Sequence, residues 1–566
     1  EPVRVRRKAF PLRELSWPAA VAALVFLIYI PTLSYEFTNW DDPVYVLANR
    51  AIQTPGWQGV KQIVTSAIPA SHGDYLPVTI LSYWLDFQWW GLRATGFHLS
   101  NVLLHVMGSC LLFLLLKRLT MRPVASIIVT LLFALHPMNT EAVTWVAERK
   151  SVMAMFWMLL SFHAFLGHGQ GRKGCGVHYV LSLLFYILAC LSKTAVVFFP
   201  FLLLAHQVLL SRAGLMRSLL RLAPFFFIAL FTAIGRIFGH HASGQMDWSP
   251  FETPLSHVLT VFDVFGAYLK DLIMPIGFNN SYPLEPATAV FDAGPIFGLL
   301  CLAGMMVIIV RYFRPYPLIC FGLAWYLAAW LPHSQIIPIP PALRADRYVY
   351  YSSAGLFLAL VAGAERLVMH AKHALASKGL QRLMCAFGFL IIGVLASMTV
   401  VRNNVWSDSI SLWSDSVSKY SQNPMAHCNL AMAYTEKGRV DEAIEAYKKA
   451  LAINDNNADA HNNLAGLYVR KRRFNDAISG YKKALAVNGR LREAHSNLGT
   501  VYAMKGRLDH AIAEFHAALA IDPNHAKTHY FLGLAYGKKG MVEEAMAQFK
   551  KAAEIRERAL RLKGVK

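Results

Sequence analysis

The sequence is poor in charged residues, and acidic residues are especially few. Only 16% of its 566 residues are charged, and 34 acidic side chains stand against 55 basic ones. Soluble domains carry about 25% charged residues, so a wholly soluble chain is excluded. The seven cysteines include no CxxC pair, which argues against a disulfide framework or a zinc site. P-loop, dinucleotide-binding glycine and HExxH motifs are absent, so we expect no nucleotide donor bound through such a motif.

Hydrophobic side chains are abundant instead and make up 55% of the chain. Up to residue 401 they gather in segments long enough for helices to cross a hydrocarbon core of about 30 Å. A further apolar stretch, 255–274, contains charged residues and is predicted to be interfacial or re-entrant. We therefore predict an all-α fold, a polytopic transmembrane domain followed by an α-solenoid. The eleven predicted spans are 17–34, 98–116, 123–137, 151–166, 177–192, 194–210, 222–239, 295–311, 317–331, 353–369 and 383–401.

The placement of charge predicts the orientation of these spans. With the N-terminus inside, the inner loops hold the basic clusters and almost no acids, while the opposite loops hold most of the acidic residues. By the positive-inside rule the N-terminus is cytoplasmic, and an odd number of spans places the C-terminal module outside. The net charge of +21 is therefore interpreted as a topology signal, and no nucleic-acid partner is expected. The predicted inner cations include Arg212, Arg217, Arg221, Arg311, Arg314 and Arg366.

From Arg402 onward the sequence repeats with a period of 34 residues. Small, aromatic and leucine positions recur in register over four units, together with His427, His461, His495 and His529. This pattern is the signature of tetratricopeptide repeats, which form a solenoid with a concave groove. The predicted domains are a multi-span transmembrane domain at 1–401, a half-repeat connecting helix at 402–423 and four repeats at 424–566.

Two polar ladders run through these repeats. Asn429, Asn463 and Asn497 recur on the predicted groove side, where an amide could bind the backbone of an extended peptide or simply suit a solvated helix face. The repeated histidines are expected to pack between helices, because neighbouring units are about 8 to 10 Å apart and cannot share a metal ion.

An acidic pair, Asp41 and Asp42, follows the first predicted span directly. One carboxylate could accept a proton from an acceptor hydroxyl while the other orients it or holds a cation. Mutual repulsion would raise the pKa of one of the two. The alternative is an Asp-Asp-Pro turn that ends the helix. Any divalent cation used by the protein is expected at this pair, and metal dependence stays open.

Five cations break the acidic bias of the predicted outer loops, and all lie at or near span ends. Guanidinium and ammonium groups at headgroup depth suit the phosphate of a lipid carrier. Alternatively they snorkel or pair with Glu141, Glu148 and Asp346. His98 and His136, at predicted outer ends, are further candidates for a supporting role. The five cations are Arg149, Lys150, Lys193, Arg344 and Arg347.

Taken in order, these motifs resemble bacterial tetratricopeptide-containing membrane proteins of the GT-C glycosyltransferase superfamily. Those proteins are related to the transmembrane and tetratricopeptide repeat-containing O-mannosyltransferases. The resemblance covers nearly the whole chain. Its carriers are Trp40-Asp-Asp-Pro-Val-Tyr45, His98-Leu-Ser-Asn-Val-Leu-Leu-His105, His136-Pro with Glu141-Ala-Val and Glu148-Arg-Lys150, Ser192-Lys193 and Ala345-Asp-Arg-Tyr348.

The resemblance implies transfer of a sugar from a polyprenyl-phosphate carrier to a hydroxyl acceptor on the outer face. It implies that Asp41 or Asp42 is the base or a metal-facing carboxylate. The carrier phosphate would be held by Arg149, Lys150, Lys193 and Arg347, with Glu141 and Asp346 orienting them. Two departures affect sugar recognition: Ser151 stands where similar proteins often carry Asp, and Tyr75-Leu-Pro77 where many have Trp-His-Pro. With Ser151 in that place, Glu148 or Glu141 is the candidate for the second carboxylate.

The expected protein is a multi-pass glycosyltransferase of a bacterial inner membrane whose periplasmic repeats bind the acceptor or a protein partner. One alternative is a non-enzymatic membrane-anchored scaffold. Another is a transporter of lipid-linked sugars, which would need charges along a path through the membrane. The strongest ionisable set lies at one face, which favours surface chemistry over transport.

Overall fold

The computed structural model describes residues 12–65, 75–120, 122–168, 175–242, 251–283, 285–338, 342–374 and 378–562. Within these ranges the secondary structure is helical and contains no β-strand, which confirms the predicted all-α class. Most of the N-terminal basic segment lies outside the described residues. The chain divides into two compact units, Glu1–Asp415 and Ser416–Lys566.

Seven helices of the described chain are long and apolar enough to cross a membrane. An eighth span results if the pair Pro123–Ala134 and Pro137–Thr144, bent by 52°, is counted as one. Three shorter apolar helices cover 176–192, 194–210 and 317–333. These segments overlap all eleven predicted spans, so the multi-pass membrane character is confirmed. The number of spans and their orientation stay predictions.

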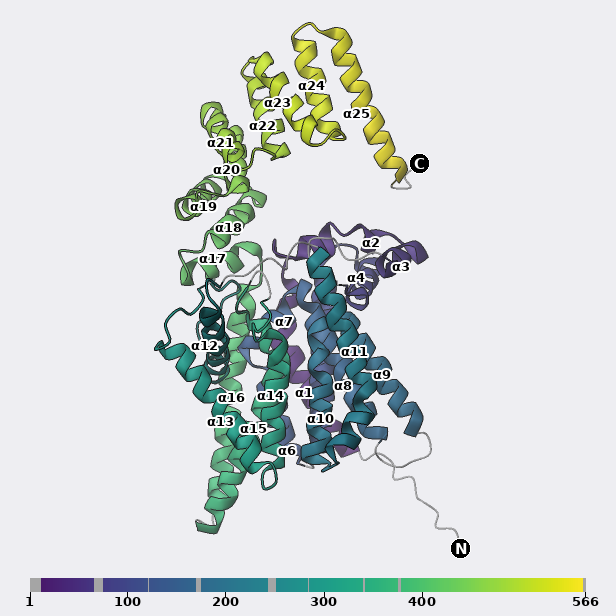
Figure 1. The fold of residues 1–566 in the computed structure, drawn as a ribbon, viewed down its shortest axis with the longest axis vertical. Coiled ribbons are helices and arrows are strands. Elements are labelled where there is room, and N and C mark those ends of the chain that lie inside the picture. Colours follow the sequence, from purple (N-terminus) through teal and green to yellow (C-terminus); the bar gives the residue numbers. More distant parts are fainter. Residues whose placement is uncertain are drawn as a thin grey trace. The chain divides into compact units, whose positions relative to one another are not determined.

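The first unit is a bundle of long helices (Figure 1). Helix α5 contacts α1, α6 and α8, while α8 also packs along α9, and α14 along α15. The α14–α15 contact depends on glycine, because a Cβ on Gly322 would lie 2.7 Å from the carbonyl oxygen of Gly355. The long helices are α1 Leu12–Tyr29, α5 Ala94–Thr120, α6 Pro123–Ala134, α8 Arg149–His168, α9 Cys175–Ser192, α11 Leu215–Ala242, α12 Pro254–Ile273, α13 Ala293–Tyr312, α14 Pro317–Trp330, α15 Tyr350–Ala374 and α16 Lys378–Val405.

Short helical segments connect the long ones at the end of the bundle that carries the predicted outer motifs. Three of them lead directly into long or apolar helices: η4 Val146–Glu148 into α8, η5 Thr194–Phe198 into α10, and η8 Asp346–Val349 into α15. Each therefore fixes the side chains at the start of its helix. Further helical elements of the first unit are η1 Ile30–Ser34, η2 Pro43–Leu47, α2 Arg50–Gln53, α3 Gly56–Thr65, α4 Pro77–Trp90, η3 Pro137–Asn139, α7 Thr140–Thr144, α10 Phe199–Ala205, η6 His206–Leu210 and η7 Leu331–His333.

Helix α12 corresponds to the stretch predicted to be interfacial or re-entrant. The hydroxyl of Thr253 caps it by accepting the Ser256 N–H at 3.1 Å. The helix packs along α13 and is not among the segments that meet the length and hydropathy criteria for a span. Its relation to a membrane stays a prediction.

The second unit consists of paired helices in the predicted 34-residue register. At each turn between the paired helices one residue has a positive φ: 74° at Gly438, 57° at Arg472, 74° at Gly506 and 83° at Gly540. Small residues let the paired helices approach closely, since a Cβ on Gly499 would lie 2.8 Å from the Phe515 ring. The helices are α18 Pro424–Glu436, α19 Val440–Ile453, α20 Ala458–Arg470, α21 Phe474–Val487, α22 Arg492–Met504, α23 Leu508–Ile521, α24 Ala526–Lys538 and α25 Val542–Leu562.

Three of the repeated histidines, His427, His461 and His529, are buried, and His495 is partly buried. In each repeat the His Nε2 is within hydrogen-bonding distance of the carbonyl oxygen six residues earlier, in the turn that precedes its helix. The distances are 2.9 Å at His427, 3.0 Å at His461, 3.2 Å at His495 and 3.0 Å at His529. These side chains therefore fix the turn at the start of each repeat.

The predicted connecting segment 402–423 is divided between the two units. Residues 402–415, including most of α17 Ser409–Lys419, belong to the first unit. The physical reason is packing. Trp406 and Trp413 are almost fully buried, and the segment hydrogen-bonds to the loop after α1.

Candidate active site

Asp42 fixes the loop that carries the acidic pair. Its Oδ2 accepts the N–H of Thr38 at 2.8 Å and the Thr38 hydroxyl at 3.1 Å, and its Oδ1 accepts the N–H of Ala147 at 2.8 Å. The side chain is buried, and burial raises its pKa to about 7 even though these three donors oppose the shift. Asp42 thus connects the loop after α1 to the segment that begins α8.

Asp41 is half-buried, and its backbone begins the short helix η2. Its carbonyl oxygen accepts the N–H groups of Val44 and Tyr45, each at 3.0 Å. Its carboxylate is close enough to Lys150 for their charges to interact. The ammonium of Lys150 in turn lies 4.9 Å from the centre of the Tyr45 ring. The two members of the pair therefore differ: Asp42 is an anchor, and Asp41 is the one that stands beside a cation.

Glu148 is the centre of the cationic group. Its carboxylate binds the Lys193 ammonium directly, and lies 3.6 Å from Lys150 Nζ and 3.7 Å from Arg347 Nε. Ser151 bridges the same pair, because its hydroxyl donates to Glu148 and accepts from Lys193 at 2.6 Å. Glu148 is fully buried, whereas the three cations keep between 11% and 14% of their side chains exposed.

A second carboxylate, Glu141, holds Arg347 from the other side. It accepts both the guanidinium N–H and the backbone N–H of Arg347, the latter at 3.1 Å. The guanidinium also lies over aromatic rings, 5.5 Å from Trp145 and 5.0 Å from Tyr348. Three cations thus share two carboxylates. Burial lowers the pKa of the Lys193 ammonium to about 8, although Glu148 opposes that shift.

Arg149 belongs elsewhere, although it stands next to Lys150 in sequence. Its guanidinium pairs with Asp86 at 2.6 Å and donates to Asn101 Oδ1 at 2.7 Å and to the Phe97 carbonyl at 2.8 Å. It also lies 4.5 Å from the Tyr83 ring centre. The side chain has no exposed surface, so the geometry fits a role in joining α4, α5 and α8 better than phosphate binding.

Arg344 and Asp346 form a separate group near α12. Arg344 pairs with Asp271 and lies 4.3 Å from the centre of the Tyr282 ring. Asp346 accepts the Tyr282 hydroxyl at 2.6 Å and lies 3.4 Å from the Arg402 guanidinium. The predicted site cations are therefore in three places, and only Lys150, Lys193 and Arg347 come together.

The two histidines singled out in the sequence make packing contacts. His98 packs edge-on against Tyr35, with ring centres 6.2 Å apart. His136 caps η3 by accepting the Met138 N–H at 3.2 Å, and its other ring nitrogen lies 3.2 Å from the Leu272 carbonyl. Both are buried.

Sequence reasoning missed the segment that holds the loop after α1. The carbonyl of Ser407 accepts the Glu36 N–H at 2.9 Å, and the hydroxyl of Ser409 accepts the Asn39 N–H at 2.9 Å. The Trp413 indole donates to Asn39 Oδ1 at 2.7 Å. We call Arg402–Trp413 the clasp segment. Tryptophans at 406 and 413, unusual in a predicted polar connector, were the available signal.

Tryptophan rings fill the space between the clasp segment and the start of α8. Trp40 lies 4.8 Å from Trp145, 6.4 Å from Trp406 and 5.1 Å from Trp413, measured between ring centres. The residue directly before Asp41 is therefore held by aromatic packing. The loop's position is fixed from both sides.

Comparison with known proteins agrees with both units. Two family models match the second unit, one for the TPR repeat at residues 431–472 and one for the tetratricopeptide repeat at 490–558. Protein O-mannosyl-transferase TMTC4 of Homo sapiens is 24% identical over 67% of this chain and 58% of its own length. Protein O-mannosyl-transferase F38B6.6 of Caenorhabditis elegans is 24% identical over 68% of this chain and 54% of its own length. Protein O-mannosyl-transferase Tmtc1 of Drosophila melanogaster is 28% identical over 32% and 21%.

The homologues of this chain are protein O-mannosyl-transferases. The chain spans less than two thirds of the length of each of these three relatives. Among solved structures, the crystal structure of MamA is 28% identical over 27% of this chain and 90% of that chain, with a TM-score of 0.26. YrrB, described as a TPR protein with an unusual peptide-binding site, is 26% identical over 26% and 77%, with a TM-score of 0.25.

A metal site in this mannosyl-transferase homologue would need several ligands, and the described residues contain no group of three or more His, Cys, Asp or Glu placed to hold an ion. At the acidic pair, both oxygens of Asp42 already accept hydrogen bonds from the protein. A divalent cation at Asp41 and Asp42 stays a prediction that the structure does not test.

The repeats of the mannosyl-transferase homologue contain a pocket of about 380 Å³. Asn463 and Asn497 line it, together with Asn462, which sequence analysis had not singled out. Asn497 donates to Asn462 at 3.1 Å, and Asn462 donates to Asn463 at 3.2 Å. The third member of the predicted ladder, Asn429, is not among the residues that line this pocket.

Proposed function

We propose that the protein is a membrane glycosyltransferase that moves a sugar from a polyprenyl-phosphate carrier to a hydroxyl acceptor. The observation that carries this proposal is the group of three partly exposed cations around one buried carboxylate, beside Asp41. The homologues named as protein O-mannosyl-transferases support mannose as the first sugar to test.

In the proposed reaction, the acceptor oxygen bonds to the anomeric carbon of the sugar while the bond from that carbon to the phosphate oxygen breaks. Asp41 takes the proton of the acceptor hydroxyl, as a general base near the reacting group would. The bonding electrons leave with the carrier phosphate. Lys150, Lys193 and Arg347 stabilise that departing charge, because charge-assisted hydrogen bonds to phosphate are stronger than neutral ones.

Two residues are assigned differently from the sequence-based expectation. Asp42 acts by holding the loop, because its carboxylate is buried and fully occupied by Thr38 and Ala147. Arg149 acts by joining helices, because its guanidinium is paired with Asp86 in a buried position. Neither is proposed to contact the donor.

The repeat pocket is proposed to hold an extended stretch of the acceptor or of a partner protein. Its three asparagines offer both donors and acceptors to a peptide backbone. The site is proposed to face the outside of a bacterial inner membrane, because the predicted inner loops carry the basic clusters.

The test uses the full chain in lipid nanodiscs with radiolabelled undecaprenyl-phosphate mannose and a membrane protein pool as acceptor. Asp41→Asn and Lys193→Gln should each abolish or strongly reduce transfer. Two matched controls, Asp292→Asn and Lys61→Gln, remove the same charges from exposed positions and should leave transfer intact. If the folded wild type transfers sugar and all four variants match it, the site assignment is wrong. If no donor supports transfer but the repeats still bind protein, the scaffold function replaces the proposed glycosyltransferase function.

A further inference from the structure

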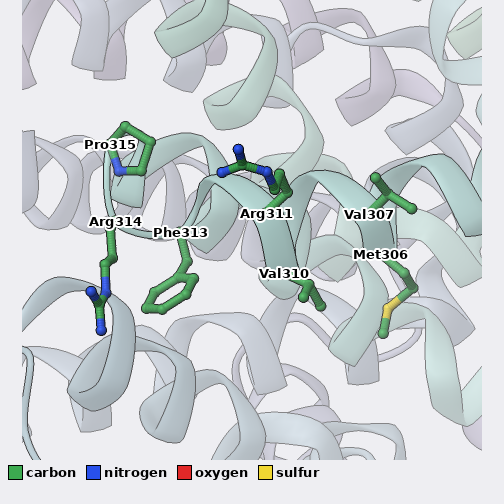
Figure 2. Close-up of a pocket in the computed structure, with 7 residues that line it drawn as sticks. All are labelled: Met306, Val307, Val310, Arg311, Phe313, Arg314 and Pro315. Atoms are coloured by element: carbon green, nitrogen blue, oxygen red, sulfur yellow. The ribbon is translucent and has the colours of Figure 1, made fainter.

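A second group of cations lies among the predicted inner loops, outside the candidate active site. The end of α13 and the turn that follows form an open pocket of about 780 Å³ (Figure 2). Its apolar wall consists of Met306, Val307 and Val310 along one side of the helix, and Phe313, Arg311 and Arg314 follow at its end.

The apolar wall belongs to a helix that packs along α12 but leaves most of its apolar surface exposed. Among the candidate spans of the described chain, helix α13 has the highest mean hydropathy. Only 11% of its apolar stretch is buried inside the protein. Val307 and Val310 are 61% and 69% exposed. In a bilayer such a surface meets acyl chains, so the wall suits the hydrocarbon part of a lipid.

The arginines at the end of this wall have no carboxylate partner among the described residues. No Asp or Glu occurs anywhere between Asp292 and Asp346. Arg311 and Arg314 lie over the rings of Tyr312 and Phe313, at 5.7 Å and 5.6 Å, and form no ion pair within the described part of the chain.

A third cation is connected to this end of α13 through aromatic rings. Arg366 of α15 lies 5.8 Å from the centre of the Tyr316 ring, and that ring is 6.0 Å from Tyr312. The acid next to Arg366 in sequence, Glu365, is already paired with Arg122 at 2.8 Å. Among the described residues, no carboxylate therefore neutralises Arg311 and Arg314 at the end of the pocket.

We propose that this pocket binds an anionic glycerophospholipid, whose phosphodiester contacts Arg311 and Arg314 and whose acyl chain lies along Met306, Val307 and Val310. A guanidinium suits phosphate because it donates two parallel hydrogen bonds. Aromatic rings at headgroup depth are typical of a membrane boundary and here support the arginine side chains. This pocket shares no residue with the proposed sugar-transfer site, so the two proposals are independent.

The experiment measures lipid retention by the full chain in detergent by native mass spectrometry. Phosphatidylglycerol and phosphatidylcholine with identical acyl chains are added in equal amounts. We expect preferential retention of phosphatidylglycerol by the wild type. In the double variant Arg311→Gln/Arg314→Gln this preference should fall about 25-fold, since each interfacial cation contributes about fivefold. The matched control is Arg212→Gln/Arg217→Gln, which removes two exposed arginines from another predicted inner loop and should keep the wild-type preference.

Two results would overturn the proposal. One is equal retention of the two lipids by the wild type, which would leave these arginines as topology determinants alone. The other is the same loss of preference in both double variants, which would mean that total positive charge, and not this pocket, attracts the lipid. Because the readout is lipid binding, neither result depends on whether the protein transfers sugar.

Discussion

The hydrogen bond from Trp413 to Asn39 can be removed almost in isolation. Replacing Trp413 by Phe keeps an aromatic ring beside Trp40 but deletes the indole N–H that donates to Asn39 Oδ1 at 2.7 Å. Leaving a partly buried acceptor without its donor costs about 1 to 3 kcal/mol. The open form of the loop should then be about 5- to 150-fold more populated.

Amide hydrogen exchange measures the opening of this loop directly. The N–H groups of Glu36 and Asn39 both donate to the clasp segment, so their exchange should accelerate by that factor in Trp413→Phe. Trp157→Phe is the control, because it makes the same change of ring at an indole N–H that has no hydrogen-bond partner in the described structure. Unchanged exchange across residues 36–42 in Trp413→Phe would refute the role of the clasp segment in fixing the loop.

The remaining predictions concern charge and backbone conformation. Because burial raises the pKa of Asp42 to about 7, the stability of the wild type relative to Asp42→Asn should fall as pH rises from about 4 to 7 and then level off, which thermal unfolding at several pH values would measure. Because the pKa of Lys193 is lowered to about 8, the KM for the lipid-linked donor should rise above that pH, and Lys193→Arg should remove the rise. Arg149→Gln should cost about 3 to 5 kcal/mol of stability by leaving a buried carboxylate unpaired, and any active fraction should keep the wild-type KM. Arg472→Gly should stabilise the repeats by about 0.5 to 1 kcal/mol because φ is 57° there, whereas Gly506→Ala should destabilise them by a similar amount; denaturant unfolding of the full chain measures both.

Local patterns predicted the helices and the repeats well. A run of about 20 apolar residues or a 34-residue period is visible in the local sequence. It predicts a membrane-spanning helix or a repeat without knowledge of the tertiary contacts. The positive-φ position shows both the strength and the limit of this reasoning. The period places Arg472 where the other repeats have glycine, but only the backbone shows that the arginine adopts the left-handed conformation as well.

The sequence did not predict that two adjacent residues, such as Arg149 and Lys150, have different contacts. Consecutive residues on a helix point about 100° apart, so Arg149 and Lys150 face different neighbours despite their adjacency. One turns to Asp86, 63 positions earlier in the chain, and the other to Glu148. Asp42 likewise depends on the backbone of Ala147, which no local pattern connects with it.

The clasp segment was interpreted as a connector because the repeat period was extended backwards to residue 406. The period is satisfied by small and aromatic residues, and Trp413 fits it. The structure uses the same tryptophan to hold Asn39, in the first unit. A side chain that fits a repeat pattern can therefore serve a contact outside the repeats, and periodicity alone does not locate the boundary between the units.

The arrangement around Glu148 explains how three cations can share a mostly buried place, which is the place proposed to bind the carrier phosphate. Three positive side chains brought together without counter-charge would repel one another and lose much of their hydration. Glu148 and Glu141 offset part of this positive charge and fix the side chains, and Asp41 interacts with Lys150 from the loop after α1. Burial is the first cause that lowers the pKa of Lys193, and Lys150 and Arg347 lower it further, while Glu148 opposes the shift. A carrier phosphate bound as proposed would add negative charge beside these cations, so side chains that are costly to bury would gain favourable contacts.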